Sequence, residues 1–221
     1  MARAAKTVGI ILSGCGHQDG SEIHEATVAL LALDRAGVTV RAAAPDVEQM
    51  QVVDHLTGKP SAEKRRALVE SARIVRGQIE SLEKLHAADL DALLFPGGYG
   101  AAKSLCSFAV DGAGLKVQPQ VERIVREMHA ARKPMGFICI SPVIAVTVLG
   151  EHKPRVTIGD DRETAAIITA LGGVHVECKV DEIALDEKNK LVSTPAYMLG
   201  PSIAPVARGV EKLVAKLLEL A

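Results

Sequence analysis

Four cysteines offer the most direct chemistry in this chain, because a thiolate is a strong nucleophile at neutral pH. Cys15, Cys106, Cys139 and Cys178 form neither a C-x-x-C pair nor a Cys/His ladder with the spacing of a zinc site. The amino-terminal apolar stretch is short and ends in glycines and polar residues, so it predicts a buried strand rather than a signal peptide. We therefore expect a cytoplasmic protein with four free thiols and no metal site.

Cys139 has the most suggestive position of the four. It lies where the apolar run of residues 135–140 gives way to Ser141 and Pro142, and proline is well tolerated in the first turn of a helix. A helix N-terminus stabilises negative charge, so this pattern predicts a nucleophilic thiol with a lowered pKa. The pattern resembles the G-x-S-x-G nucleophile elbow, although Phe137 replaces its first glycine. A buried structural cysteine is the alternative interpretation.

A glycine turn and an acidic helix start could complete such a site. Gly97 and Gly98 follow Pro96, and their missing side chains leave backbone N–H groups free to hold an oxyanion. Glu22 and Glu25 lie at the start of residues 21–35, whose apolar positions recur with helical spacing. The alternatives are an ordinary tight turn and acids that merely favour a helix start.

The elements that must position these residues alternate between strands and helices. This alternation predicts an α/β three-layer sandwich, with a mostly parallel central sheet, helices on both faces and a single domain over residues 1–221. We expect strands at residues 7–13, 38–44, 91–95, 135–140, 155–158 and 174–178, a hairpin at 183–195, and helices at 21–35, 61–75, 120–131, 163–171 and 203–220, with Ser21 capping the first and Gly37 ending it.

In such a sheet, ligands bind beyond the carboxyl ends of the strands. Four segments meet at that edge: GCGHQDG (14–20), PGGYG (96–100), the Cys139 turn and TPAYM (194–198). We therefore expect Cys15 to line the pocket or to compete with Cys139 as the reactive thiol. Tyr197 is assigned either to the pocket mouth or to packing.

Several motifs together resemble one known family. LLFPGGYGAAKSL (93–105) followed by GFICISP (136–142), with a helix-borne glutamate in SEIHEA (21–26) before DRAG (34–37), is similar to the ThiJ/PfpI superfamily. ILSGCG (11–16), HLTG (55–58) and TPAYM resemble more narrowly the ElbB branch, whose members are described as isoprenoid-biosynthesis or glyoxalase proteins. The similarity runs over nearly the whole chain and implies a flavodoxin-like, amidotransferase-like fold.

The resemblance also assigns roles to residues. It implies that Cys139 is the nucleophile, that Gly98 and the Ile140 backbone N–H form the oxyanion site, and that Glu25 is the carboxyl beside the sulfur, with Glu22 as the alternative one turn earlier. The residue after the nucleophile is often histidine in the superfamily and is Ile140 here. No Cys-His dyad forms by adjacency, which argues against peptidase chemistry.

The activity implied by the resemblance is that of a glutathione-independent glyoxalase. It would convert small α-oxoaldehydes such as methylglyoxal or glyoxal to 2-hydroxy acids through a Cys139 hemithioacetal, without a metal or an organic cofactor, in a homodimer. One alternative is a redox sensor or chaperone that uses Cys139 without turnover. Another is an amidotransferase-like hydrolase, in which His175 and Glu177 would complete a triad with the cysteine.

Binding of nucleotides, nucleic acids or membranes is disfavoured. Gly14, Gly16 and Gly20 only loosely follow the dinucleotide-binding pattern, and the nearby acids would repel a pyrophosphate. The net charge is −1, aromatic residues make up 2% of the chain and tryptophan is missing, so neither an electrostatic patch nor a base-stacking platform is expected. No apolar run is long enough for a membrane helix.

Overall fold

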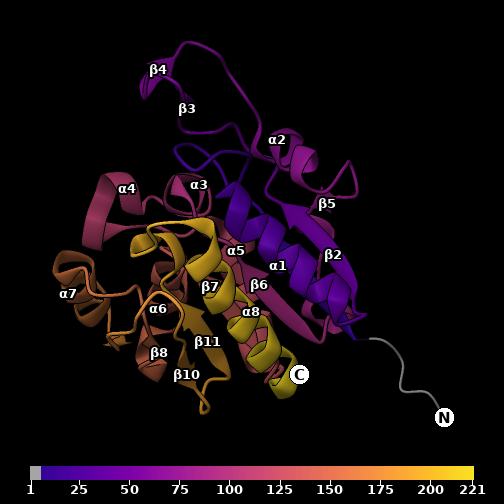
Figure 1. The fold of residues 1–221 in the computed structure, drawn as a ribbon, viewed down its shortest axis with the longest axis vertical. Coiled ribbons are helices and arrows are strands. Elements are labelled where there is room, and N and C mark those ends of the chain that lie inside the picture. Colours follow the sequence, from indigo (N-terminus) through magenta and orange to yellow (C-terminus); the bar gives the residue numbers. More distant parts are fainter. Residues whose placement is uncertain (1–5) are drawn as a thin grey trace.

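The computed structural model describes residues 6–221 and shows a seven-stranded sheet covered by helices on both faces (Figure 1). The strand order is β10-β11-β7-β6-β1-β2-β5, and every neighbouring pair is parallel except β10 with β11. The strands are β1 (Thr7–Ile11), β2 (Thr39–Ala44), β5 (Glu80–Ser81), β6 (Ala92–Phe95), β7 (Met135–Ile138), β10 (Ala184–Asp186) and β11 (Leu191–Thr194). The expected three-layer α/β fold is confirmed. Residues 1–5, where the amino-terminal segment weighed as a signal peptide begins, lie outside the described part.

The helices lie against the two faces of this sheet. They are α1 (Ile23–Arg35), α2 (Ala67–Ile74), α3 (Tyr99–Lys103), α4 (Phe108–Asp111), α5 (Pro119–Ala130), α6 (Pro142–Leu149), α7 (Arg162–Ala170) and α8 (Ile203–Leu220), with short 3-10 turns that include η5 (Ala196–Met198). Two further strand pairs stand apart from the main sheet: β3 (Val52–Asp54) with β4 (Lys59–Ser61), and β8 (Arg155–Val156) with β9 (Val174–His175).

The central strands β1, β6 and β7 are buried on both sides, which explains their nearly continuous apolar sequences. Successive side chains of β6 and β7 point alternately into the two hydrophobic cores on the two faces of the sheet. Leu94 and Ile138 belong to the cluster under α1 and α8, whereas Phe95 and Phe137 belong to the cluster under α5 and α6. The two phenylalanine rings stack with their centroids 5.0 Å apart. Each such side chain stabilises the fold by roughly 1.5–3 kcal/mol on burial.

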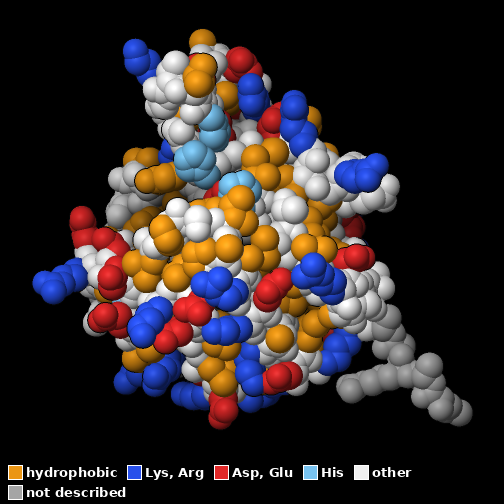
Figure 2. Space-filling view, viewed as in Figure 1, with side chains coloured by type: hydrophobic (Ala, Val, Ile, Leu, Met, Phe, Trp, Pro, Cys, Tyr) orange, Lys and Arg blue, Asp and Glu red, His pale blue; other side chains and the backbone are white. Residues whose placement is uncertain are grey.

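Three expected elements and one helix cap differ in the structure. The helix expected at 61–75 begins only at Ala67, because residues 59–61 pair with β3 and form an arm that projects at the top of Figures 1 and 2. The strands expected at 155–158 and 174–178 are reduced to β8 and β9, which pair with each other outside the main sheet. The N-cap of α1 is Glu22, whose carboxylate accepts the Glu25 N–H at 2.7 Å. Ser21 instead accepts the Ser13 N–H with its hydroxyl.

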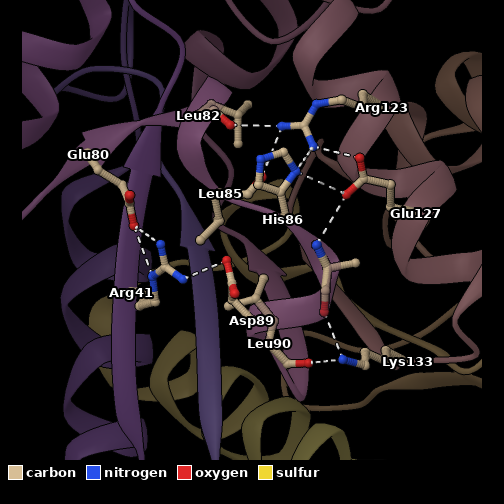
Figure 3. A network of polar contacts seen from close by, with 11 residues as sticks. Arg41, Glu80, Leu82, Leu85, His86, Asp89, Leu90, Arg123, Glu127 and Lys133 are labelled. Carbon is tan, nitrogen blue, oxygen red and sulfur yellow. Dashed lines mark hydrogen bonds and ion pairs between the residues drawn. The ribbon is translucent and has the colours of Figure 1, made fainter.

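A polar network holds the segment between β5 and β6 against the rest of the fold (Figure 3). At the sheet edge, Arg41 pairs with Glu80 at 2.6 Å and with Asp89 at 3.0 Å. On α5, Arg123 pairs with Glu127 at 2.8 Å and donates to the carbonyls of Leu82 and Leu85. Lys133 donates to two further carbonyls of the segment, so arginine and lysine side chains pair with its acids and with the carbonyls of its buried residues.

Candidate active site

Cys139 occupies the turn between β7 and α6. Its φ of +63° lies in the left-handed region, which is strained for a residue with a side chain and is retained where the surroundings enforce it. The turn is held by Ser141, whose hydroxyl accepts the Ile138 N–H at 2.8 Å and lies 2.9 Å from the Phe95 carbonyl. The elbow predicted from the sequence is therefore present, and only 8% of Cys139 is exposed.

Glu25 lies beside the sulfur of Cys139 and is fully buried. Its Oε2 accepts the Gly97 N–H at 2.9 Å, and its Oε1 accepts the Tyr197 N–H at 3.2 Å. The same carboxyl oxygen and the Cys139 sulfur lie on one side of Gly97, where a Cβ would be 2.8 Å from the oxygen and 3.0 Å from the sulfur. Within residues 6–221, no lysine or arginine pairs with Glu25, so only dipoles offset the cost of burying its charge.

The protonation of this pair differs from the sequence-based expectation. Burial, followed by the negative charge of Glu22, raises the pKa of Glu25 to about 8. Burial, followed by the charge of Glu25, raises the pKa of Cys139 well above its ordinary value, although the N–H groups of Gly98 and Ile140 act in the opposite direction. The predicted lowering of the Cys139 pKa was wrong, because burial beside an acid outweighs the helix N-terminus.

Gly97 and Gly98 are glycines for steric reasons. A Cβ on Gly97 would lie 2.3 Å from the Cβ of Cys139, and one on Gly98 would lie 2.4 Å from the Gly20 carbonyl oxygen. Gly98 also has a φ of +92°. The N–H groups of Gly98 and Ile140 favour the thiolate of Cys139, and the oxyanion site stays a prediction. Gly97 differs, because its N–H is committed to Glu25 and its part is to let Cys139 and the carboxyl approach.

A pocket of about 740 Å³ opens above Cys139. It contains four further residues predicted for the site, which are Glu22, Gly98, Ile140 and Tyr197. Tyr197 thus lines the pocket and also packs against the core under α1 and α8.

His24 is a pocket residue to which the sequence assigned no part. Its Nδ1 lies 2.8 Å from the Tyr197 hydroxyl and 3.8 Å from a carboxylate oxygen of Glu22. His24 precedes Glu25 in the chain, and the only sequence signal was its place between two acids at a helix start. The hydrogen bond to Tyr197 spans 173 residues of sequence, so spacing could not reveal it.

Cys15 is not among the residues that line the pocket, contrary to expectation. Its segment forms a bridge to Ser21, and burial, followed by the charge of Glu70, raises the pKa of its thiol. Cys106 is packed in the core, where burial raises its pKa to about 11. In the described part of the chain, no three His, Cys, Asp or Glu residues cluster in a way that could hold a metal ion.

The histidine considered for an amidotransferase triad lies elsewhere. His175 is in β9, outside the main sheet, and its Nε2 accepts the Ile158 N–H at 3.4 Å. It does not line the pocket with Cys139. His175 and Cys139 therefore do not form a dyad in this structure.

Comparison with known proteins places the chain in a family. A human protein called "Glutamine amidotransferase-like class 1 domain-containing protein 3, mitochondrial" is 48% identical over 228 residues, which cover 99% of this chain and 84% of that protein. The chain belongs to the amidotransferase-like class 1 proteins. No family model matches it. An isoprenoid biosynthesis protein with an amidotransferase-like domain from Ehrlichia chaffeensis is 40% identical, with a TM-score of 0.92 over 98% of this chain and 99% of that one.

More distant proteins share the fold of this amidotransferase-like protein. A DJ-1 superfamily protein from Salmonella typhimurium, 24% identical, has a TM-score of 0.57 over 97% of this chain and 91% of that one. The fold implied by the resemblance to the ThiJ/PfpI superfamily is thereby confirmed, and the Ehrlichia protein confirms the similarity to isoprenoid-biosynthesis proteins. No helix within residues 6–221 has the length and apolarity needed to span a bilayer.

Proposed function

We propose that this amidotransferase-like protein is a cofactor-independent glyoxalase that converts small α-oxoaldehydes, such as methylglyoxal and glyoxal, to 2-hydroxy acids. The observation that supports this most is the buried Glu25 carboxyl, which lies beside the Cys139 sulfur. A carboxyl with a pKa of about 8 can accept and return a proton near neutral pH. Such a shuttle suits an isomerisation in which one proton moves between neighbouring atoms.

The first step is addition of the sulfur to the aldehyde. In the reactive form, Glu25 is ionised and Cys139 carries the thiol proton. The proton moves to Glu25 as the C–S bond forms, and the carbonyl π electrons become an oxyanion. The N–H groups of Gly98 and Ile140, which favour the thiolate of Cys139, are the proposed donors to this oxyanion. Glu25 then returns the proton to the oxygen and completes the hemithioacetal.

The second step moves a proton between carbons. The Glu25 carboxylate takes the proton from the former aldehyde carbon, and the released electron pair forms an enediolate with the neighbouring carbonyl. Glu25 then gives this proton to the neighbouring carbon while the proton of the hemithioacetal hydroxyl passes to the neighbouring oxygen, which gives a thioester of the 2-hydroxy acid with no external oxidant or reductant. The Tyr197 hydroxyl, held by His24, is the proposed hydrogen-bond partner of the substrate's second oxygen. Water then cleaves the thioester and frees the thiol.

The test is release of lactate from methylglyoxal by the purified protein. We expect wild-type protein to form lactate and Cys139→Ala to form none above the uncatalysed rate. Cys15→Ser is the matched control, because this thiol lies near the same sheet edge but outside the pocket, and its activity should equal that of wild type. Equal lactate release by wild type and Cys139→Ala would overturn the proposal.

Two observations weigh against the alternatives. The burial of Cys139 and its raised pKa disfavour rapid oxidation of the kind a redox sensor needs. His175 does not line the pocket, so the base considered for an amidotransferase-like hydrolase is not at the site. The free thiol needs a reducing compartment, which we propose is the cytoplasm, although the human relative is named mitochondrial.

A further inference from the structure

We infer that the preferred substrates of this site are neutral α-oxoaldehydes whose apolar substituent is larger than a methyl group, and that aldehydes bearing phosphate or carboxylate are excluded. This inference rests on the proposed function, because it takes Cys139 as the nucleophile. Three features of the pocket support it: its size, its apolar wall and the charges around it.

The pocket is far larger than methylglyoxal requires. Its volume of about 740 Å³ lies within the roughly 300–1,000 Å³ typical of sites that enclose drug-sized ligands. A three-carbon aldehyde attached to Cys139 would leave most of this space to water. A larger substituent would displace that water and gain the free energy of burial.

The wall available to such a substituent is apolar and comes from separate segments. Helices α3 and α4, the Cys139 elbow and the η5 turn each contribute apolar side chains to this wall. They are Ala102 from α3, Phe108 and Ala109 from α4, Ile140 from the elbow and Met198 from η5. An aromatic side chain and a flexible thioether can adapt to a planar or a branched group. On the face shown in Figure 2, hydrophobic side chains likewise gather below the histidines, whereas Lys, Arg, Asp and Glu are denser on the lower half.

The charges around the pocket disfavour anions. Its ionisable lining consists of two acids, Glu22 and Asp161, the Cys139 thiol, two histidines and two tyrosines, with no lysine or arginine among the described lining residues. Lys103 lies nearby, but its Nζ donates to the Gln18 carbonyl at 3.0 Å and to Gln51 at 2.7 Å. A phosphate would therefore meet like charges and no cation placed to bind it.

The first experiment measures the pocket without relying on the glyoxalase reaction. Cys139 is alkylated at pH 8.5 with iodoacetamide, N-benzyliodoacetamide or iodoacetate, and mass mapping gives each rate, normalised to the same reagent's rate with glutathione. We expect the benzyl reagent to react about tenfold faster than iodoacetamide, because even one buried methylene can be worth that factor, and iodoacetate to react about tenfold slower. Equal normalised rates would overturn the inference.

A variant pair locates the effect. Ala109→Leu adds bulk at an exposed pocket-lining position, so the fold should tolerate it, and the benzyl preference should fall by about fivefold or more. Val110→Leu lies on the same helix, is 69% exposed and does not line the pocket, so it should leave the preference unchanged. A preference that survives Ala109→Leu would contradict this pocket as the binding site.

The second experiment separates this inference from the proposed function. kcat/KM is measured for phenylglyoxal, with release of mandelate, and for methylglyoxal. We expect phenylglyoxal to exceed methylglyoxal by about tenfold or more. Turnover of both aldehydes without preference would overturn the inference and support the proposed function. Turnover of neither would overturn the proposed function, while the alkylation rates would still report what the pocket prefers.

Discussion

Glu25 and Glu127 show how differently two regions of one protein treat a carboxyl group. Glu127 belongs to the network of Figure 3, where it pairs with Arg123 at 2.8 Å. Partial burial raises the pKa of Glu127, but Arg123 and the Ala87 N–H outweigh this and lower it overall. Glu25 is fully buried with no cation beside it, and its pKa is about 8.

The difference separates a structural acid from a reactive one. The network fastens a connecting segment to the fold, and a permanently ionised carboxylate serves that purpose. At the candidate active site, the fold keeps a carboxyl that resists ionisation beside a thiol that also resists it. Perturbed groups of this kind cluster at functional sites because catalytic acids, bases and nucleophiles need pKa values matched to their task. Substitution of Glu25 should therefore lower turnover strongly, whereas substitution of Glu127 should leave turnover almost unchanged.

Glu25→Gln should have the largest effect. It keeps the side-chain volume but removes the exchangeable proton, so turnover of methylglyoxal should fall by about 10²-fold or more. Steady-state lactate release measures this. Glu127→Gln is the matched control in the network and should leave kcat/KM within about twofold, because it touches neither the pocket nor Cys139. Near-wild-type activity of Glu25→Gln would reject the shuttle.

Stability should respond to pH at Glu25. Its folded pKa of about 8 exceeds the unfolded value, so the stability it contributes is complete below about pH 4.5 and is lost as pH rises towards 8. Gln cannot ionise, but it leaves one of two backbone N–H groups without an acceptor. We expect Glu25→Gln to be less stable at pH 5, and its deficit to shrink by a few kcal/mol by pH 8.5. Urea unfolding at both pH values would measure this.

The pH profile of turnover should follow the same carboxyl. Because the reactive form has Glu25 ionised, kcat/KM should rise about tenfold per pH unit and level off above about pH 8. Glu22→Gln removes the negative charge that raises this pKa but keeps an oxygen for the N-cap. Its profile should therefore shift to lower pH while the maximal rate changes little. An unshifted profile would show that Glu22 does not act on Glu25.

The smallest expected effect is on the stability of the network. Glu127→Gln should lower the free energy of unfolding at pH 7 by about 0.5–1 kcal/mol, because a partly exposed ion pair contributes little. Urea unfolding would detect this as a lower midpoint with an unchanged m-value. A loss of several kcal/mol would mean that the network carries more of the fold than its exposure suggests.

The sequence by itself determined the local elements and the order in which they come. The apolar runs and their glycine and proline boundaries place β1, α1, β6, β7 and α8 close to their observed bounds, since burial on both faces or on one helical stripe leaves a direct periodic signal. The same local signals placed Cys139 at an elbow and Gly98 at the sheet edge. These depend on the backbone conformation of a few consecutive residues, which their types constrain.

Only the tertiary structure decided how the site is charged and which groups are free to act. The pKa of Cys139 is raised because the fold buries its thiol and places Glu25, from a distant part of the chain, beside it. The N–H of Gly97 is occupied by that same carboxyl, Cys15 lies outside the pocket, and His24 reaches Tyr197 from another element. Desolvation and hydrogen bonding depend on which atoms meet in space, and spacing along the chain does not record that.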